Sequence, residues 1–209
     1  MRALRNALLR VWAPSRRVAP WLMGVGVGIG VACRHGDADR ALAPPPEAQE
    51  WLPALAELFD DGITVAPLRF DGRAPNDVLD QRLFHRRLGH SDLVALVRVE
   101  QVWGRGRHQG SPTQYIDVTF QEIMVGALPK DTARRHMLEI VSAVDVPSSL
   151  PGQPLLLFLR WAPSHKRPYH YHVVSAHDDA VASVEAAVDH ARSQRATRRG
   201  RRHRRGATE

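Results

Sequence analysis

From Ser91 onward, apolar and polar residues alternate with a period of two instead of recurring every three or four positions. Valine, isoleucine and aromatic residues are enriched in these runs, which is typical of strands with one buried face. The segments between the runs are rich in turn-forming residues. The sequence therefore predicts a mainly β protein with five strands, Leu93 to Trp103, Gln114 to Val125, Arg135 to Ala143, Pro154 to Trp161 and Tyr169 to Ser175.

The second of these runs changes register part-way along. Ile116, Val118 and Phe120 share one face, and the apolar series then continues one position out of step at Ile123 and Val125. A β-bulge near residues 121–122 would return the series to the same face, and such bulges bend strands in barrels.

Helices are expected on both sides of the strand region. The first would span Glu47 to Asp60, although Pro53 is tolerated only in a first turn and would otherwise kink it. The second would run from Asp77 to Leu88, with Asn76 as its N-cap. Its inward residues should be Val78, Leu79, Leu83 and Phe84.

Five consecutive strands with flanking helices fit a small antiparallel barrel of the OB type, with a β-sandwich as the alternative. The segments Ser91 to Val99, Ile116 to Gly126 and Gly152 to Leu159 resemble the barrel strands of netrin-like modules, the group that includes the tissue inhibitors of metalloproteinases. The resemblance implies the barrel fold. The chain lacks the cysteines that staple most such modules.

The N-terminus has the layout of a secretory signal. Residues 1–20 are basic, residues 21–32 are uncharged and mostly apolar, and the only cysteine, Cys33, follows directly. Twelve residues form about 18 Å of helix, which is short of the ~30 Å hydrocarbon core of a membrane. This junction resembles the lipobox of bacterial lipoproteins, in which the cysteine is acylated and becomes the first mature residue. The resemblance implies a lipid anchor at Cys33 in the bacterial cell envelope, and Arg34 favours the outer membrane.

Proline residues follow the cysteine at positions 44–46, so residues 33–48 are expected to form an extended tether. The folded domain would then occupy residues 49–190. It should end in an amphipathic helix from Asp178 to about Ser193, with an apolar stripe of Val181, Val184, Val188 and Ala191.

The formal charge of +7 is unevenly distributed. Residues 33–190 contain 16 basic and 21 acidic residues, so the predicted domain is acidic, whereas residues 191–209 contain eight arginines and one acid. This tail has little apolar surface to bury and is expected to be disordered. In the envelope its polyanionic partners would be anionic lipid or lipopolysaccharide, and in the cytoplasm nucleic acid. The arginines concerned are Arg198, Arg199, Arg201, Arg202, Arg204 and Arg205.

Two histidines suggest a metal site. His170 and His172 stand two apart in a predicted strand and therefore on one face, where His165 or His177 could complete a zinc or copper site. Alternatively, Tyr169, Tyr171 and Val173 form the buried face and both histidines look into solvent.

No G-x-S-x-G elbow, phosphate loop or HExxH motif occurs, and no cofactor is expected apart from a possible metal ion. The sequence therefore predicts an envelope lipoprotein with a non-catalytic binding or structural module of unknown partner. One alternative is a secreted metal-binding protein or enzyme using the His165 to His177 region. The second is a nucleic-acid-associated protein that retains residues 1–32 and binds through its Arg-rich tail.

Overall fold

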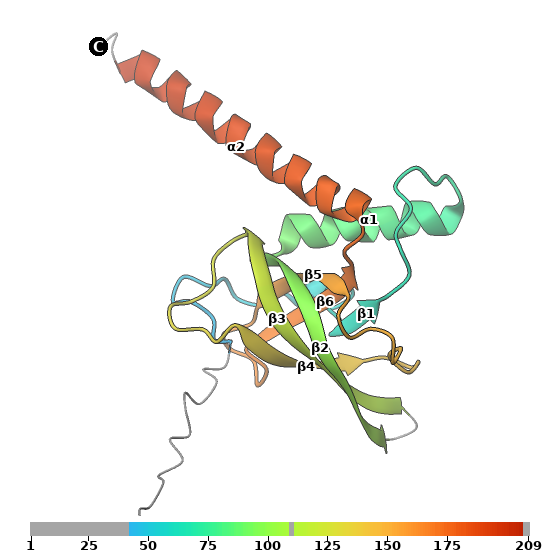
Figure 1. The fold of residues 1–209 in the computed structure, drawn as a ribbon. Coiled ribbons are helices and arrows are strands. Elements are labelled where there is room, and N and C mark those ends of the chain that lie inside the picture. The colour runs from blue at the N-terminus through green and yellow to red at the C-terminus, as the bar shows by residue number, and fades with distance from the viewer. Residues whose placement is uncertain (1–41, 109–110, 207–209) are drawn as a thin grey trace, which may run out of the picture. The chain divides into compact units, whose positions relative to one another are not determined.

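The computed structural model describes residues 42–108 and 111–206. It is mainly β, with six strands in one curled, mixed sheet that forms a half-barrel, and two α-helices (Figure 1). The strand order is β1-β6-β5-β2-β3-β4. The elements are η1 (Pro53–Leu55), β1 (Gly62–Thr64), α1 (Pro75–His90), β2 (Leu93–His108), β3 (Ser111–Val125), β4 (Arg135–Val141), β5 (Pro154–Trp161), β6 (Tyr169–Ser175) and α2 (Asp178–Gly206).

All five predicted strands are present, and β5 and β6 have the predicted bounds. Strands β2 and β3 are longer than predicted, and β4 ends two residues earlier. The prediction of a five-stranded antiparallel barrel missed β1, which pairs in parallel with β6 through Gly62 and His172. A strand of three residues is too short to carry an alternating pattern, so its sequence gave no signal.

The predicted bulge in β3 is confirmed. Phe120 pairs with Val97 and Glu122 pairs with Leu96, which leaves Gln121 as the extra residue. Ile123 accordingly packs in the same core as Phe120. The prediction for Val125 was wrong, because a further register shift between Val94 and Ala95 turns Val125 toward the opposite core.

The sheet has a hydrophobic core on each face. Strand β5 is buried on both, because Leu155, Leu157 and Leu159 enter one core while Leu156 and Phe158 enter the other. The first core lies inside the curl of the sheet and contains side chains from β2 to β6. The second lies on the other face, where side chains of η1, α1 and the start of α2 cover it. Figure 1 shows both α-helices on one side of the sheet.

The two helices predicted before the sheet needed correction. Over residues 47–60 only the three residues of η1 are helical. Pro53 begins that short turn, so a helix from Glu47 could not continue through it. Helix α1 begins at Pro75, one residue before the predicted cap Asn76. Of its predicted inward residues, Phe84 is fully buried and Leu83 half-buried, whereas Val78 and Leu79 are 42% and 54% exposed.

Both ends of the predicted domain also differ from expectation. Leu42 is buried in the first core, so the last part of the predicted tether packs against the body. Helix α2 continues to Gly206, although residues 191–209 were expected to be disordered. Arginine and alanine are good helix formers, and no proline interrupts this stretch. Within the described residues, no helix is both long and apolar enough to span a membrane.

One pair of identical substitutions tests the core assignment. Leu157→Ala should lower the free energy of unfolding by about 3 kcal/mol, because it removes a fully buried side chain and leaves a cavity. Leu79→Ala should change it by less than about 0.5 kcal/mol, because this leucine is mostly exposed. Denaturant unfolding measures both values, and equal losses would contradict the placement of Leu79.

Candidate functional site

His172 is buried within a pair of hydrogen bonds instead of facing solvent or a metal ion. Its Nδ1 lies 2.6 Å from Oδ1 of Asp60, and its Nε2 lies 3.0 Å from Oγ1 of Thr64. A neutral ring protonated at Nδ1 satisfies both contacts, donating to Asp60 and accepting from the Thr64 hydroxyl. Both ring nitrogens are therefore hydrogen-bonded, one to Thr64 in the short strand β1 and the other to Asp60 just before that strand.

His170 and the other two histidines are held separately. Nδ1 of His170 lies 3.0 Å from Oδ2 of Asp61, and the ring packs against Trp51 at 4.5 Å between centroids. The ring of His165 is 6.1 Å from that of His170, while His177 packs against Phe70. In the described part of the chain, no three His, Cys, Asp or Glu side chains are placed to hold a metal ion. The predicted zinc or copper site is therefore not assembled there.

The structure instead places Asp61 at the centre of a polar seam, defined by Asp61, Glu139, Arg167, His170 and Tyr171. Asp61 Oδ2 accepts from Arg167 at 2.5 Å, and Oδ1 accepts from the Tyr171 N–H at 3.1 Å. Its backbone N–H donates to the Tyr171 carbonyl, and its own carbonyl accepts from the Val141 N–H, each at 2.8 Å. This residue, with φ +56°, therefore joins β6 to the edge of β4.

Further contacts of the seam tie the two edges of the sheet together. The second nitrogen of Arg167 donates to Oε2 of Glu139 at 2.6 Å, and the Tyr171 hydroxyl donates to the Glu139 carbonyl. Burial alone would lower the pKa of Arg167, but Asp61 and Glu139 outweigh it and raise that pKa. Burial also raises the pKa of Tyr171. A small cavity of about 210 Å³ lies beside the seam and is lined by Tyr115, Met137, Glu139, Arg167, Tyr169 and Tyr171.

The Asp60–His172 pair has shifted pKa values for both partners. Burial lowers the pKa of His172, and the hydrogen bond to Asp60 offsets this only in part. Burial also acts to raise the pKa of Asp60, but the hydrogen bonds from His172 and Gly62 and nearby positive charge lower it overall. The pair is therefore most stable with a neutral imidazole and an ionised carboxylate.

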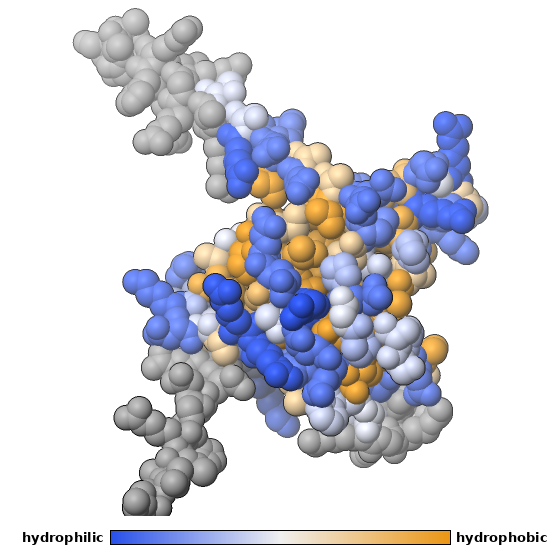
Figure 2. All heavy atoms as spheres, in the orientation of Figure 1, coloured by the Kyte–Doolittle hydropathy of each residue, from blue (hydrophilic) through white to orange (hydrophobic). Residues whose placement is uncertain are grey.

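A larger hollow lies elsewhere, between α2, the C-terminal end of α1 and the end of β3. We call it the α2 groove. Its main part has a volume of about 690 Å³, and a contiguous part of about 290 Å³ shares Met124, Val188 and Arg192 with it. Figure 2 shows apolar side chains gathered on the face between α2 and the sheet, with charged residues around them. The lining of the main part is Leu88, Gly89, Asp92, Met124, Val125, Gly126, Ala187, Val188, Ala191 and Arg192.

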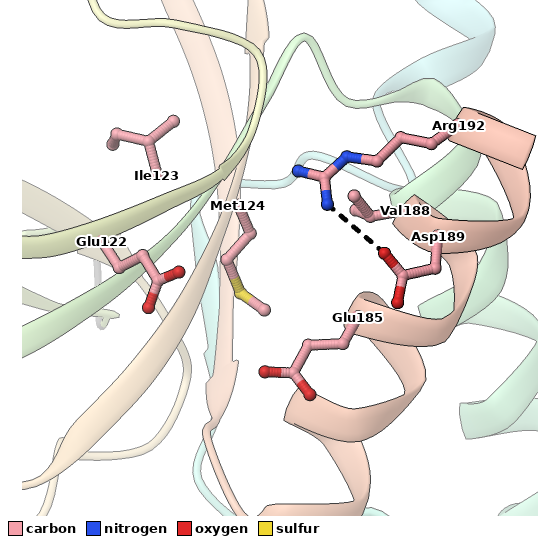
Figure 3. Close-up of a pocket in the computed structure, with 7 residues that line it drawn as sticks. All are labelled: Glu122, Ile123, Met124, Glu185, Val188, Asp189 and Arg192. Atoms are coloured by element: carbon pink, nitrogen blue, oxygen red, sulfur yellow. Dashed lines mark hydrogen bonds and ion pairs between the residues drawn. The ribbon is translucent and has the colours of Figure 1, made fainter. Parts of the chain in front are cut away.

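The smaller part of the groove is lined by more charged residues than the main part. Figure 3 shows the Met124 side chain in the space between β3 and α2, with Glu185, Asp189 and Arg192 on the helix. Arg192 Nη1 and Asp189 Oδ1 form an exposed ion pair at 3.3 Å. Asp189 is the last acidic residue before Glu209, so the charge of the chain changes sign along α2 at this pair.

The other predicted site residues lie at the ends of the chain. Cys33 lies outside the described residues. The six arginines predicted to bind anionic surfaces stand in the last turns of α2, from Arg198 to Arg205. Sequence reasoning missed Asp60, Asp61 and the groove. Two adjacent acids before a glycine and a short β-branched run were the only local signal for the first two.

Comparison of the chain with protein families, with curated proteins and with solved structures found no match.

The seam predicts a measurable coupling between Asp61 and Arg167. Asp61→Asn should cost about 2 kcal/mol of unfolding free energy, because it removes the charge that accepts from Arg167 and His170. Asp145→Asn, at an exposed position, should be nearly neutral. In denaturant unfolding, the double variant with Arg167→Gln should lose less than the sum of the two single losses. Additive losses would contradict the contact.

His172 predicts a pH dependence of stability. Its pKa is lower in the folded chain than the value of about 6.5 expected when unfolded, so the unfolded state takes up the proton first as pH falls. The contribution of His172 to the free energy of unfolding should therefore be fully present above about pH 6.5 and decrease below it. Thermal unfolding between about pH 7 and 5 should show a shallower decrease for His172→Asn than for the parent chain. His90→Asn, at an exposed histidine, should keep the parent slope, and an unchanged slope for His172→Asn would exclude this role.

Proposed function

We propose that this chain is a bacterial envelope lipoprotein in which an acylated Cys33 anchors a non-catalytic binding module. The observation that carries the proposal is the position of the only cysteine, directly after the apolar run 21–32. The buried Leu42 supports it, because only eight residues then separate Cys33 from the packed body. That segment, fully extended, spans about 30 Å, so an anchored module would stay close to the membrane surface.

The binding role is supported by how the polar groups of the body are used. Asp61, Arg167 and Glu139 bridge strand edges, and His172 is enclosed between Asp60 and Thr64. These groups serve the fold. The main part of the α2 groove is lined mainly by apolar side chains, which suits the binding of an apolar or amphipathic partner.

We propose further that the half-barrel is an OB-type barrel of the netrin-like kind, opened at one seam. Support comes from the pairing of β2 with both β3 and β5, and from the contact between the two sheet edges at Asp61 and Val141. OB-type barrels are partly open and commonly bind ligands.

The Arg-rich end of α2 adds an electrostatic component. In an envelope location its partners would be the phosphates of anionic lipid or lipopolysaccharide, each basic residue near such a surface contributing about 1 kcal/mol. Residues 33–190 carry a net negative charge, which disfavours nucleic acid as the main partner. The outer membrane remains the favoured destination because Arg34 follows the cysteine.

Intact mass and detergent partitioning test the anchor. The full chain expressed in a bacterial host should lose residues 1–32, gain the mass of acyl groups and enter the detergent phase. Cys33→Ser should abolish both the acyl mass and the partitioning, because serine offers no thiol for acylation.

The chain has no second cysteine that could be substituted as a control. Ala32→Ser, which keeps a small residue before Cys33, serves as the matched control instead. It should remain acylated. An unmodified full-length chain in the aqueous phase would overturn the anchor and the envelope location together.

A further inference from the structure

Helix α2 carries one continuous stripe whose chemistry changes along its length. The stripe follows one face of the helix because its positions are spaced alternately three and four residues apart. These positions are 181, 184, 188, 191, 195, 198, 202 and 205. The first part packs on the body, with Val184 fully buried and Val181 and Val188 half-buried. Beyond Ala191, every position of the same stripe is an arginine, namely Arg195, Arg198, Arg202 and Arg205, which we call the arginine strip.

The α2 groove opens where this change occurs. Ala187, Val188 and Ala191 form its helix wall, and Leu88, Met124 and Val125 provide apolar side chains opposite. Arg192 lines both parts of the groove at the end where the arginine strip begins. An apolar trough that leads into a strip of positive charge matches a ligand with an apolar chain and an anionic head.

Asp92 is the acidic residue that lines the main part of the groove, and it is already paired. Oδ1 of Asp92 accepts from Arg160 at 2.8 Å, and its Oδ2 accepts from the Trp161 N–H at 2.8 Å. Its charge is therefore compensated within the body. Glu122, Glu185 and Asp189 line only the smaller part of the groove, where Asp189 also pairs with Arg192 at 3.3 Å. They would repel a second anion there, so the orientation with the anionic head toward Arg192 and the arginine strip is favoured.

We infer that the α2 groove and the arginine strip bind one anionic phospholipid, with an acyl chain along the apolar lining and the phosphate at Arg192 and the turns that follow. This inference rests on the proposed envelope location, which supplies the lipid. Arginine suits this role because its guanidinium pairs with phosphate through two parallel hydrogen bonds.

Native mass spectrometry of the full-length Cys33→Ser chain in non-ionic detergent tests the inference without an acyl anchor. Phosphatidylglycerol should form a one-to-one complex, and phosphatidylcholine with the same acyl chains should bind about tenfold more weakly, because its head is zwitterionic. Glycerol 3-phosphate, which has the anion without the chain, should not compete. Because this chain is never acylated, failure of lipid binding and failure of the proposed anchor are separate results.

Matched alanine substitutions test the groove. Ala191→Trp should abolish the complex, since Ala191 is exposed and lines the groove, which a tryptophan would fill. Ala186→Trp, at an exposed alanine of the same helix outside the lining, should leave it unchanged. Circular dichroism of both variants verifies that the helix is retained. Equal binding by the two variants would overturn the groove as the site.

Matched arginine pairs test the strip. Arg195→Gln with Arg198→Gln should weaken phosphatidylglycerol binding about tenfold. Arg201→Gln with Arg204→Gln removes the same charge at the same spacing, off the stripe and farther along the helix, and should leave binding within about twofold. Equal losses for the two pairs would show general attraction by the tail and would overturn the inference. Equal binding of both lipids, or no binding at all, would also overturn it.

Discussion

The curled sheet depends on Asp61, which connects its two edges. Its backbone bonds to Tyr171 on one side and Val141 on the other, and its carboxylate holds Arg167, His170 and the Tyr171 N–H. An aspartate tolerates the left-handed conformation required here better than a bulky residue does. Strand β4 is the last strand of the sheet, and the bond from Val141 to Asp61 pairs one backbone group of an edge that could otherwise act as a template for association with other chains.

Closure at Asp61 determines what the rest of the chain must cover. The inside of the curl is filled by side chains of the sheet itself, so the outer face of β5 and its neighbours must be buried by other elements. Helix α1 supplies Phe84 and α2 supplies Val184 for this purpose. Only the first part of α2 is needed, and beyond Val188 its stripe leaves the core.

Among the residues that line the groove, Gly126 has φ +77° and approaches the Asp92 carbonyl so closely that a Cβ there would lie 2.1 Å from the oxygen. Glycine at this position therefore allows β3 to end beside Asp92.

The sequence predicts the elements that bury regular patterns and fails where contacts are non-local. The five long strands, the bulge at Gln121 and the start of α2 follow from apolar periodicity, because each places many side chains on one face. Leu79 fits a helical pattern as well as Phe84 does, and only the position of the sheet decides which is buried. The partners of His172 are 112 and 108 residues away along the chain, so the pattern that suggested a metal site could not reveal Asp60 or Thr64. Composition alone also misled at the tail, since a run of arginines can extend a helix that has already been nucleated by packing.

The two polar regions of the chain therefore have different physical roles. At the seam, opposite charges meet at short distances and neutralise one another, so little of their field is left to attract a ligand. On α2, the described acids precede the basic residues along the helix, and the ion pair between Asp189 and Arg192 marks the boundary. Beyond it, residues 193–206 contain seven arginines and no acid, so their positive charge is not balanced within the same stretch. Uncompensated charge of one sign on an extended helix favours an external anionic partner, and the apolar groove at the base of that charge limits the partner to one that also has an apolar part.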